Sequence, residues 1–219
     1  MKRMILGLAA LIAAIGARAQ DPWYAQDFSV SYVKYAYSGN NARNESLDKT
    51  ITVSRKGNEL YIHMESLMGP TDATYIFENG QVLYYKLDAR KHEASKSVKG
   101  GTYADATGAL LAQMKRYEVL ASLFQEYPKP DPKQATVKFL GRDAYEVTRS
   151  KTISAGSVTS TSSSHFVVDK ETGAVLKSRT AMSGSSSNFD KVMFECRTFN
   201  PTNPDYSKNV TSLAGYTVK

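Results

Sequence analysis

Alternating apolar and polar residues run through most of the chain, which is the pattern of β-strands with two distinct faces. Residues 28–37 are rich in β-branched and aromatic side chains and lack Gly and Pro, so they predict a strand. Residues 49–64 predict a hairpin that turns at 56–58, and residues 73–89 predict a second hairpin. The second turns at Asn79-Gly80, a pair that readily takes the positive φ angles of a type I′ turn.

In the middle of the chain, the spacing of apolar residues changes from the alternation of a strand to that of a helix. This spacing predicts one long helix over residues 103–125. Apolar side chains recur there at helical spacing, at Leu110, Met114, Tyr117, Ala121 and Phe124. Thr102 followed by Asp105 resembles an N-terminal capping arrangement. Alternating prolines at 128, 130 and 132 then exclude further helix and favour an extended crossover.

Strands resume after the crossover, at residues 135–152 with a turn near 141–143, and then at 157–169, 174–183 and 188–199. The layout is five strands, a helix and about five more strands, and the tail from residue 200 is expected to lie over the surface. We therefore predict an α+β fold, in which a single curved antiparallel sheet of about ten strands, an open half-barrel, packs on one long helix.

Several predicted strands are apolar on both faces. Tyr75 and Phe77 point one way while Ile76 points the other, and Val82 opposes Leu83 in the same manner. A sheet with one solvated face would alternate cleanly between apolar and polar residues. Both faces are therefore expected to be partly covered, and the helix is the expected cover of one.

The first nineteen residues have the order of a secretory signal. Lys2 and Arg3 precede an apolar run from Met4 to Ile15, and Ala17-Arg18-Ala19 resembles a cleavage site. The run is too short to span a bilayer, and no second long apolar run predicts a transmembrane segment in the mature chain. We expect cleavage near Ala19, a periplasmic or secreted location, and a single domain over residues 20–219.

Charge and cysteine content narrow the class of protein. The formal net charge is +7, from 28 basic and 21 acidic residues; removing Lys2, Arg3 and Arg18 leaves 25 basic residues and a net charge of +4. The basic residues are scattered, which argues against nucleic-acid binding. Cys196 is the only cysteine, so no internal disulfide can form and the fold must depend on its core.

The polar clusters predict no catalytic site, no metal site and no cofactor. His165, Asp169 and Glu171 are close in sequence, but four residues of strand separate His165 from Asp169 by roughly 13 Å. Asp169 through Gly173 instead fit a turn, because Asp bonds to backbone N–H groups ahead of it and Gly accepts the left-handed conformation. His63 and His92 lack ligands at metal-binding spacing, and no serine motif for nucleophilic catalysis occurs.

Residues 154–165 are almost entirely small and polar, with Val158 as the one large apolar residue. This composition favours a solvated edge strand or a long loop. The functional alternatives are a hydroxyl-lined rim at the mouth of a cavity, or a strand edge that is open to a partner.

The second half of the chain also resembles a known family. The segments FLGRDAYEVTRS, HFVVDKETGAVLKSR and FDKVMFECRTF resemble the C-terminal part of the LolA/LolB-like family of periplasmic lipoprotein and lipid carriers. The resemblance covers roughly residues 135–199 and rests on Gly141, Tyr145, Val147, Phe166, Val168, Asp169, Gly173, Val175 and Phe194. It implies an open antiparallel half-barrel whose concave face, covered by helices, holds acyl chains.

The leading functional hypothesis is a non-enzymatic exported protein that binds a lipid, an acylated ligand or another apolar ligand between sheet and helix. The candidate cavity residues are Leu110, Leu111, Met114, Tyr117, Phe124, Met64 and Tyr84. The alternative is an envelope protein-interaction or sensor module in which the same residues fill a core. A contiguous exposed patch formed by Tyr32, Tyr35 and Tyr37 would favour that alternative.

Overall fold

Twelve strands form one sheet in this protein. The computed structural model describes residues 22–37, 45–117, 120–121, 133–155, 158–184, 188–206, 213 and 215–219; the expected signal peptide lies outside them. The strands are β1 (Phe28–Tyr37), β2 (Glu45–Lys56), β3 (Glu59–Ser66), β4 (Gly69–Glu78), β5 (Gln81–Asp88), β6 (Glu93–Lys99), β7 (Val137–Phe139), β8 (Arg142–Ala155), β9 (Val158–Asp169), β10 (Val175–Gly184), β11 (Phe189–Asn200) and β12 (Thr217–Val218). A 3₁₀ turn, η1 (Trp23–Ala25), precedes them, and the helix α2 (Ala106–Met114) follows β6.

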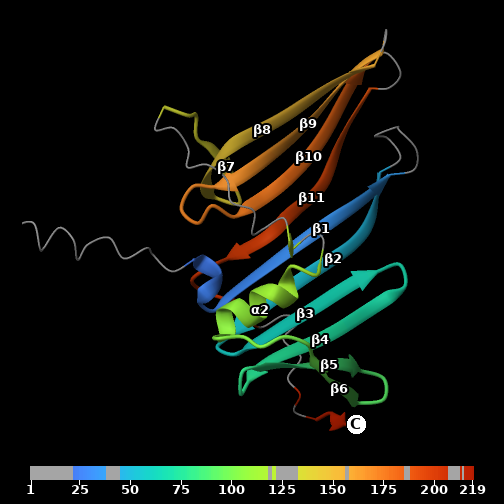
Figure 1. Ribbon diagram of the computed structural model, residues 1–219, viewed down its shortest axis with the longest axis vertical. Helices are drawn as coiled ribbons and strands as arrows, with labels where there is room; N and C mark the ends of the chain where they lie inside the picture. Colours follow the sequence, from blue (N-terminus) through green and yellow to red (C-terminus); the bar gives the residue numbers. More distant parts are fainter. Residues whose placement is uncertain are drawn as a thin grey trace, which may run out of the picture.

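The sheet consists of two antiparallel meanders joined at their first and last strands. Strands β1 to β6 pair in sequence order, as do β7 to β11, and β1 pairs with β11 in the centre (Figure 1). Strand β12 pairs in parallel with β6 at one edge, and β7 forms the other edge. Because β6 and β7 lie near opposite edges, the segment between them must pass from one side of the sheet to the other, and α2 lies in this passage.

Local turn chemistry sets the hairpins where the sequence predicts them. Asn79 and Gly80 both have positive φ angles, 51° and 77°, which confirms the type I′ turn between β4 and β5. Gly57 at φ 56° makes the turn between β2 and β3. These turns therefore fix the strand register of the first hairpins so that the alternating apolar side chains of paired strands lie on the same face.

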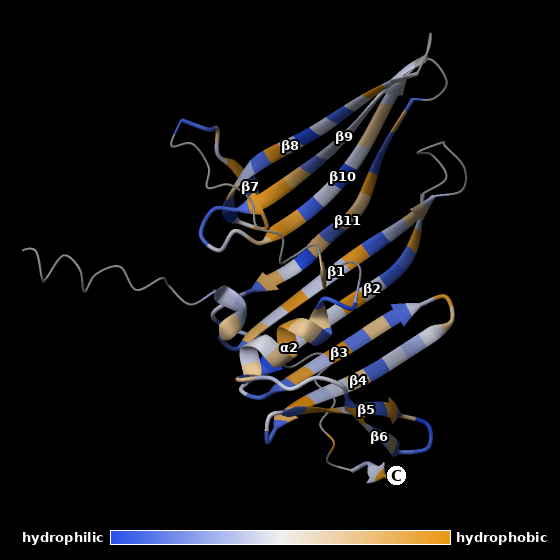
Figure 2. Cartoon of the chain, in the orientation of Figure 1, coloured by the Kyte–Doolittle hydropathy of each residue, from blue (hydrophilic) through white to orange (hydrophobic). Residues whose placement is uncertain are grey.

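The two faces of the sheet are covered by different parts of the chain. On one face, called here the helix side, α2 packs against β4 and β5 beside η1. Tyr75 and Val82 lie in the main buried cluster on that face. On the other face, Tyr85 and Leu87 form a second cluster with Tyr216 of the C-terminal tail. Figure 2 shows hydrophobic and hydrophilic residues alternating along many of the strands.

The prediction of strands that are apolar on both faces is confirmed, and the structure adds the reason. The tail crosses the far side of the sheet: the backbone N–H of Asp205 donates to Ser29, and Tyr206 donates to the carbonyl of Arg55. Further along, Tyr216 packs beside β5, and the tail ends as β12 on the edge of β6. The tail is therefore part of the packed structure as well as a surface segment.

The expected α+β fold is confirmed in its coarse features, a mostly antiparallel single sheet with one helix packed on it. The sheet has twelve strands where about ten were expected, because β6 and β12 were missed. Strand β6 carries few apolar residues, and β12 is two residues long, so neither has a periodic signal of its own.

The prediction of one long helix over residues 103–125 is matched only in part: among the described residues, 106–114 and 120–121 are helical, residues 115–117 form a turn, and residues 118–119 are not described. Helix α2 has nine residues, and its N-cap is Asp105, whose carboxylate accepts from the backbone N–H of Gly108 at 2.8 Å. The helix ends at Met114 because the next N–H groups, of Arg116 and Tyr117, bond three residues back rather than four. Residues 122–125 lie outside the described residues.

Candidate functional site

Helix α2 contributes one side of the apolar cluster at the candidate site. Leu110 and Met114 are buried against the sheet, and Leu111 and Tyr117 are half-buried beside them. The buried residues follow one stripe of the helix, as the spacing in the sequence predicts. Leu111 and Tyr117 lie at the edge of this buried stripe and are partly exposed to solvent.

The sheet contributes the opposite side of the cluster. Met64 on β3 and Tyr84 on β5 are half-buried and pack against the main apolar cluster. Met64 pairs with Ile51, and Tyr84 pairs with Tyr75, so all four side chains lie on the helix side. The described candidate cavity residues therefore belong to or border this one cluster. Whether they form a cavity stays a prediction, and Phe124 lies outside the described part of the chain.

Three tyrosines meet beside the end of α2. The hydroxyls of Tyr75 and Tyr117 are 2.9 Å apart, and the rings of Tyr75 and Tyr84 have centroids 5.0 Å apart. Burial raises the pKa of all three hydroxyls above the usual value of 10.0. They therefore remain neutral hydrogen-bonding groups at neutral pH, within a mostly apolar surrounding.

Gln113 is a polar residue of this site that the sequence analysis missed. It is completely buried, and its side-chain amide donates to the hydroxyl of Tyr103 at 3.2 Å. Its carbonyl oxygen has no hydrogen-bond partner. The signal was present in the sequence, because Gln113 falls three residues after Leu110 on the apolar stripe of the predicted helix.

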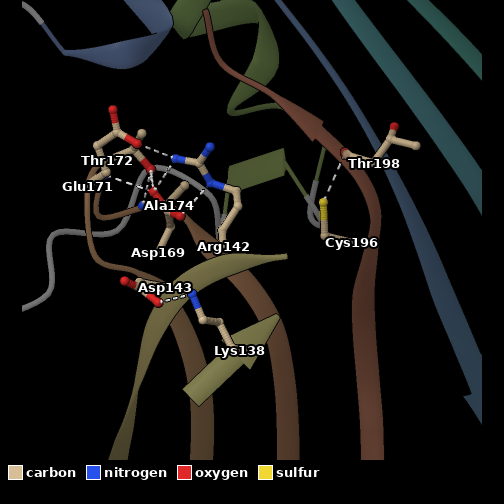
Figure 3. Close-up of polar contacts among 9 residues, drawn as sticks. All are labelled: Lys138, Arg142, Asp143, Asp169, Glu171, Thr172, Ala174, Cys196 and Thr198. Atoms are coloured by element: carbon tan, nitrogen blue, oxygen red, sulfur yellow. Dashed lines mark hydrogen bonds and ion pairs between the residues drawn. The ribbon is translucent and has the colours of Figure 1, made fainter. Parts of the chain in front are cut away.

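The turn after β9 is built around a buried carboxylate (Figure 3). Asp169 accepts from the backbone N–H of Thr172 at 2.9 Å, and the N–H of Gly173 donates to its carbonyl at 2.9 Å. Gly173 has φ 73°, so the predicted turn is confirmed. The sequence did not predict the partner: Arg142 donates to both oxygens of Asp169, at 2.6 and 3.1 Å, and to Glu171 at 2.7 Å.

His165, which is close to Asp169 in sequence, does not take part in the contacts of the Asp169 turn. His165 lies 3.0 Å from the hydroxyl of Thr148 on β8, whereas Asp169 is held by Arg142. On β3, His63 contacts Asp72 at 2.8 Å and Glu65 at 3.4 Å. Partial burial alone would lower the pKa of His63, but these two contacts outweigh it and raise the pKa above 6.5.

Cys196 is buried, as its apolar flanks suggest. Burial raises the pKa of its thiol to about 12, and the thiol donates to the carbonyl of Thr198 at 3.0 Å. A thiol with so high a pKa carries almost no thiolate at neutral pH, so Cys196 serves as a small packing residue.

Strand β9 corrects the expectation of an edge strand or loop for residues 154–165. It lies between β8 and β10, although most of its side chains are partly exposed. Cross-strand hydroxyl pairs replace apolar contacts: Ser150 with Ser163 at 2.8 Å, and Thr152 with Thr161 at 2.9 Å. The polar composition marks a solvated strand, but it does not mark an edge, because pairing depends on the backbone.

The tyrosines of β1 do not form the patch that would favour a protein-interaction module. Tyr32 is completely buried and donates to the carbonyl of Val175 at 2.8 Å. Tyr35 accepts from Arg197 at 2.6 Å on the opposite face. The strand therefore distributes its aromatic side chains between both faces.

The described residues contain neither a cluster of metal ligands nor a membrane-spanning helix. No group of three or more His, Cys, Asp or Glu side chains among them could hold a metal ion. No helix in this part of the chain is long and apolar enough to cross a membrane.

The turn network gives the first prediction. Replacing Asp169 with Ala should lower the free energy of unfolding by about 2–4 kcal/mol, because its buried carboxylate accepts hydrogen bonds from Arg142 and from the backbone N–H and hydroxyl of Thr172. Glu171→Ala is the matched control: Glu171 contacts the same arginine, but its side chain is 73% exposed, so its loss should cost less than about 1 kcal/mol. Urea unfolding of both variants measures the difference, and equal losses would contradict the assignment.

Comparison with known proteins leaves the chain without an assigned family. No protein-family model matches it, and no curated protein and no solved structure matches it either.

Proposed function

We propose that this protein is an exported, non-enzymatic carrier that binds a lipid or another apolar ligand between α2 and the helix side of its sheet. The observation that carries the proposal is the incomplete cover of the apolar cluster. Leu110 and Met114 are buried in the main apolar cluster, whereas Met64, Leu111 and Tyr117, which pack against that cluster, remain partly exposed. A short helix over a wide sheet leaves apolar surface where a ligand chain can replace water.

Polar groups at the same place support an amphipathic ligand. The Tyr75–Tyr117 hydroxyl pair and the unpartnered carbonyl oxygen of Gln113 lie among apolar side chains. Small-molecule sites are commonly of this kind, mostly apolar with a few polar groups that orient the ligand. The turns shared with LolA/LolB-like carriers and the signal-like N-terminus support a periplasmic half-barrel that handles acyl chains.

In the alternative function, an envelope interaction or sensor module, the same residues fill a core and no ligand binds. Native mass spectrometry of gently purified protein separates the two. We expect additional mass from a bound lipid in the wild type and its loss in Leu111→Trp, whose larger ring occupies the space. Val98→Trp is the control, because Val98 is exposed on the other face of β6. Protein that carries no lipid and accepts none would contradict the proposal.

A carrier must exchange its ligand with a membrane, and the β3–β4 turn is suited to contact one. Leu67 and Met68 at its tip are 91% and 97% exposed, and Leu47 at the same end of the sheet is also exposed. Exposed apolar side chains at a turn tip are costly in water and favourable in the interfacial region of a bilayer.

Replacing both tip residues with Asp should weaken cosedimentation with phospholipid vesicles by about tenfold or more, because two large apolar side chains no longer enter the bilayer. Leu140→Asp is the matched control, since Leu140 is an exposed apolar residue in a turn at the opposite end of the sheet. Equal vesicle binding by the tip variant and the wild type would exclude this turn as the membrane contact.

A further inference from the structure

Two cations flank the tyrosines of the candidate site. Lys99 lies on the helix side of β6, and its ammonium nitrogen is 4.0 Å from the centroid of the Tyr84 ring. Arg116 follows α2 directly and is exposed. Its backbone N–H donates to the carbonyl of Gln113, and it directly precedes Tyr117, whose hydroxyl is 2.9 Å from that of Tyr75. Lys99, Tyr84, Tyr75 and Tyr117 thus form a continuous row of contacts, with Arg116 at the far end.

Within the described part of the chain, neither Lys99 nor Arg116 makes an ion pair. Cations elsewhere in the sheet do: Lys177 contacts Glu195 at 2.8 Å, and Lys138 contacts Asp143 at 2.6 Å. Arg179 likewise pairs with Asp190. The positive charge beside the tyrosines is therefore not neutralised by the described carboxylates, unlike the charges of Lys138, Lys177 and Arg179.

This arrangement favours a negative group at the edge of an apolar surface. An ammonium held over an aromatic ring and a guanidinium beside buried hydroxyls both attract an anion. The attraction is stronger where neighbouring side chains exclude water, as the burial of Tyr75 and Tyr117 indicates. Leu111 on α2 supplies apolar surface without charge. Met64 lies on the same face of β3, four residues beyond Leu60, the strand partner of Tyr75, so an extended chain reaches it over roughly 13 Å.

We propose that the ligand is an anionic amphiphile, whose carboxylate or phosphate head binds Lys99 and Arg116 while its chain lies along Met64 and Leu111. This inference rests on the proposed function and adds the charge of the ligand to it. The Tyr75–Tyr117 hydroxyl pair borders the head and chain positions and donates to the anion.

Three probes with the same chain test the inference: oleate, oleyl phosphate and oleyl alcohol. Their affinities are measured by displacement of an apolar fluorophore at low and at high salt. The wild type should bind both anions at least about tenfold more tightly than the alcohol at low salt, and the ratio should fall at high salt. A preference for one anion over the other distinguishes a carboxylate from a phosphate head.

The double variant Lys99→Gln, Arg116→Gln should lose the preference for anions and keep its affinity for oleyl alcohol. Lys96→Gln is the matched control, because Lys96 lies on the same strand over a tyrosine ring, 5.8 Å from Tyr85, but on the other face. It should retain the preference.

The outcomes separate this inference from the function on which it rests. Equal affinity of the wild type for oleate and oleyl alcohol, or an equal loss in Lys96→Gln, would overturn the anionic ligand and leave the apolar site intact. Failure of all three probes to bind would overturn the proposed function itself. Thermal melting of each variant checks folding, which these solvent-facing substitutions should not disturb.

Discussion

The pairing of β1 with β11 is the contact on which the rest of the structure depends. It joins two meanders that are otherwise separate, and it brings together residues as distant as Ser29 and Asn200. Val30 faces Phe199 in this pairing, so apolar side chains of both meanders enter one cluster. Closing so long a loop is entropically costly, and this cost is offset only when many side chains are buried at once. The apolar cluster and the central pairing therefore form together or not at all.

A single wide sheet built in this way has two faces, and the described residues cover each of them only in part. Helix α2 and η1 cover part of one face, and the C-terminal tail crosses the other. Because α2 has only nine residues, it leaves the margin of the apolar cluster partly exposed, at Met64, Tyr84 and Leu111. The candidate site is thus a consequence of topology: a short crossover helix lies on a sheet that extends well beyond it.

Features governed by neighbouring residues could be predicted from the sequence, whereas features governed by distant partners could not. The turn at Asn79-Gly80 and the turn at Asp169 depend on local backbone chemistry, and both are confirmed. Strand β6 was missed because its partner β5, rather than its own composition, determines its conformation. The ion pair between Arg142 and Asp169 joins two strands, so no spacing along the chain indicates it. The buried stripe of α2 at Leu110 and Met114 follows the helical spacing of the sequence, whereas the end of α2 at Met114 does not.

The central claim is that an apolar chain binds between α2 and the helix side of the sheet. Methyl-labelled methionine makes this directly measurable by NMR, because Met64 and Met114 lie at the site while Met68 lies at the exposed turn. With oleate bound, the account predicts nuclear Overhauser contacts between the oleate chain and the methyl groups of Met64 and Met114. Contacts confined to Met68, or none to the two methionines at the site, would contradict it.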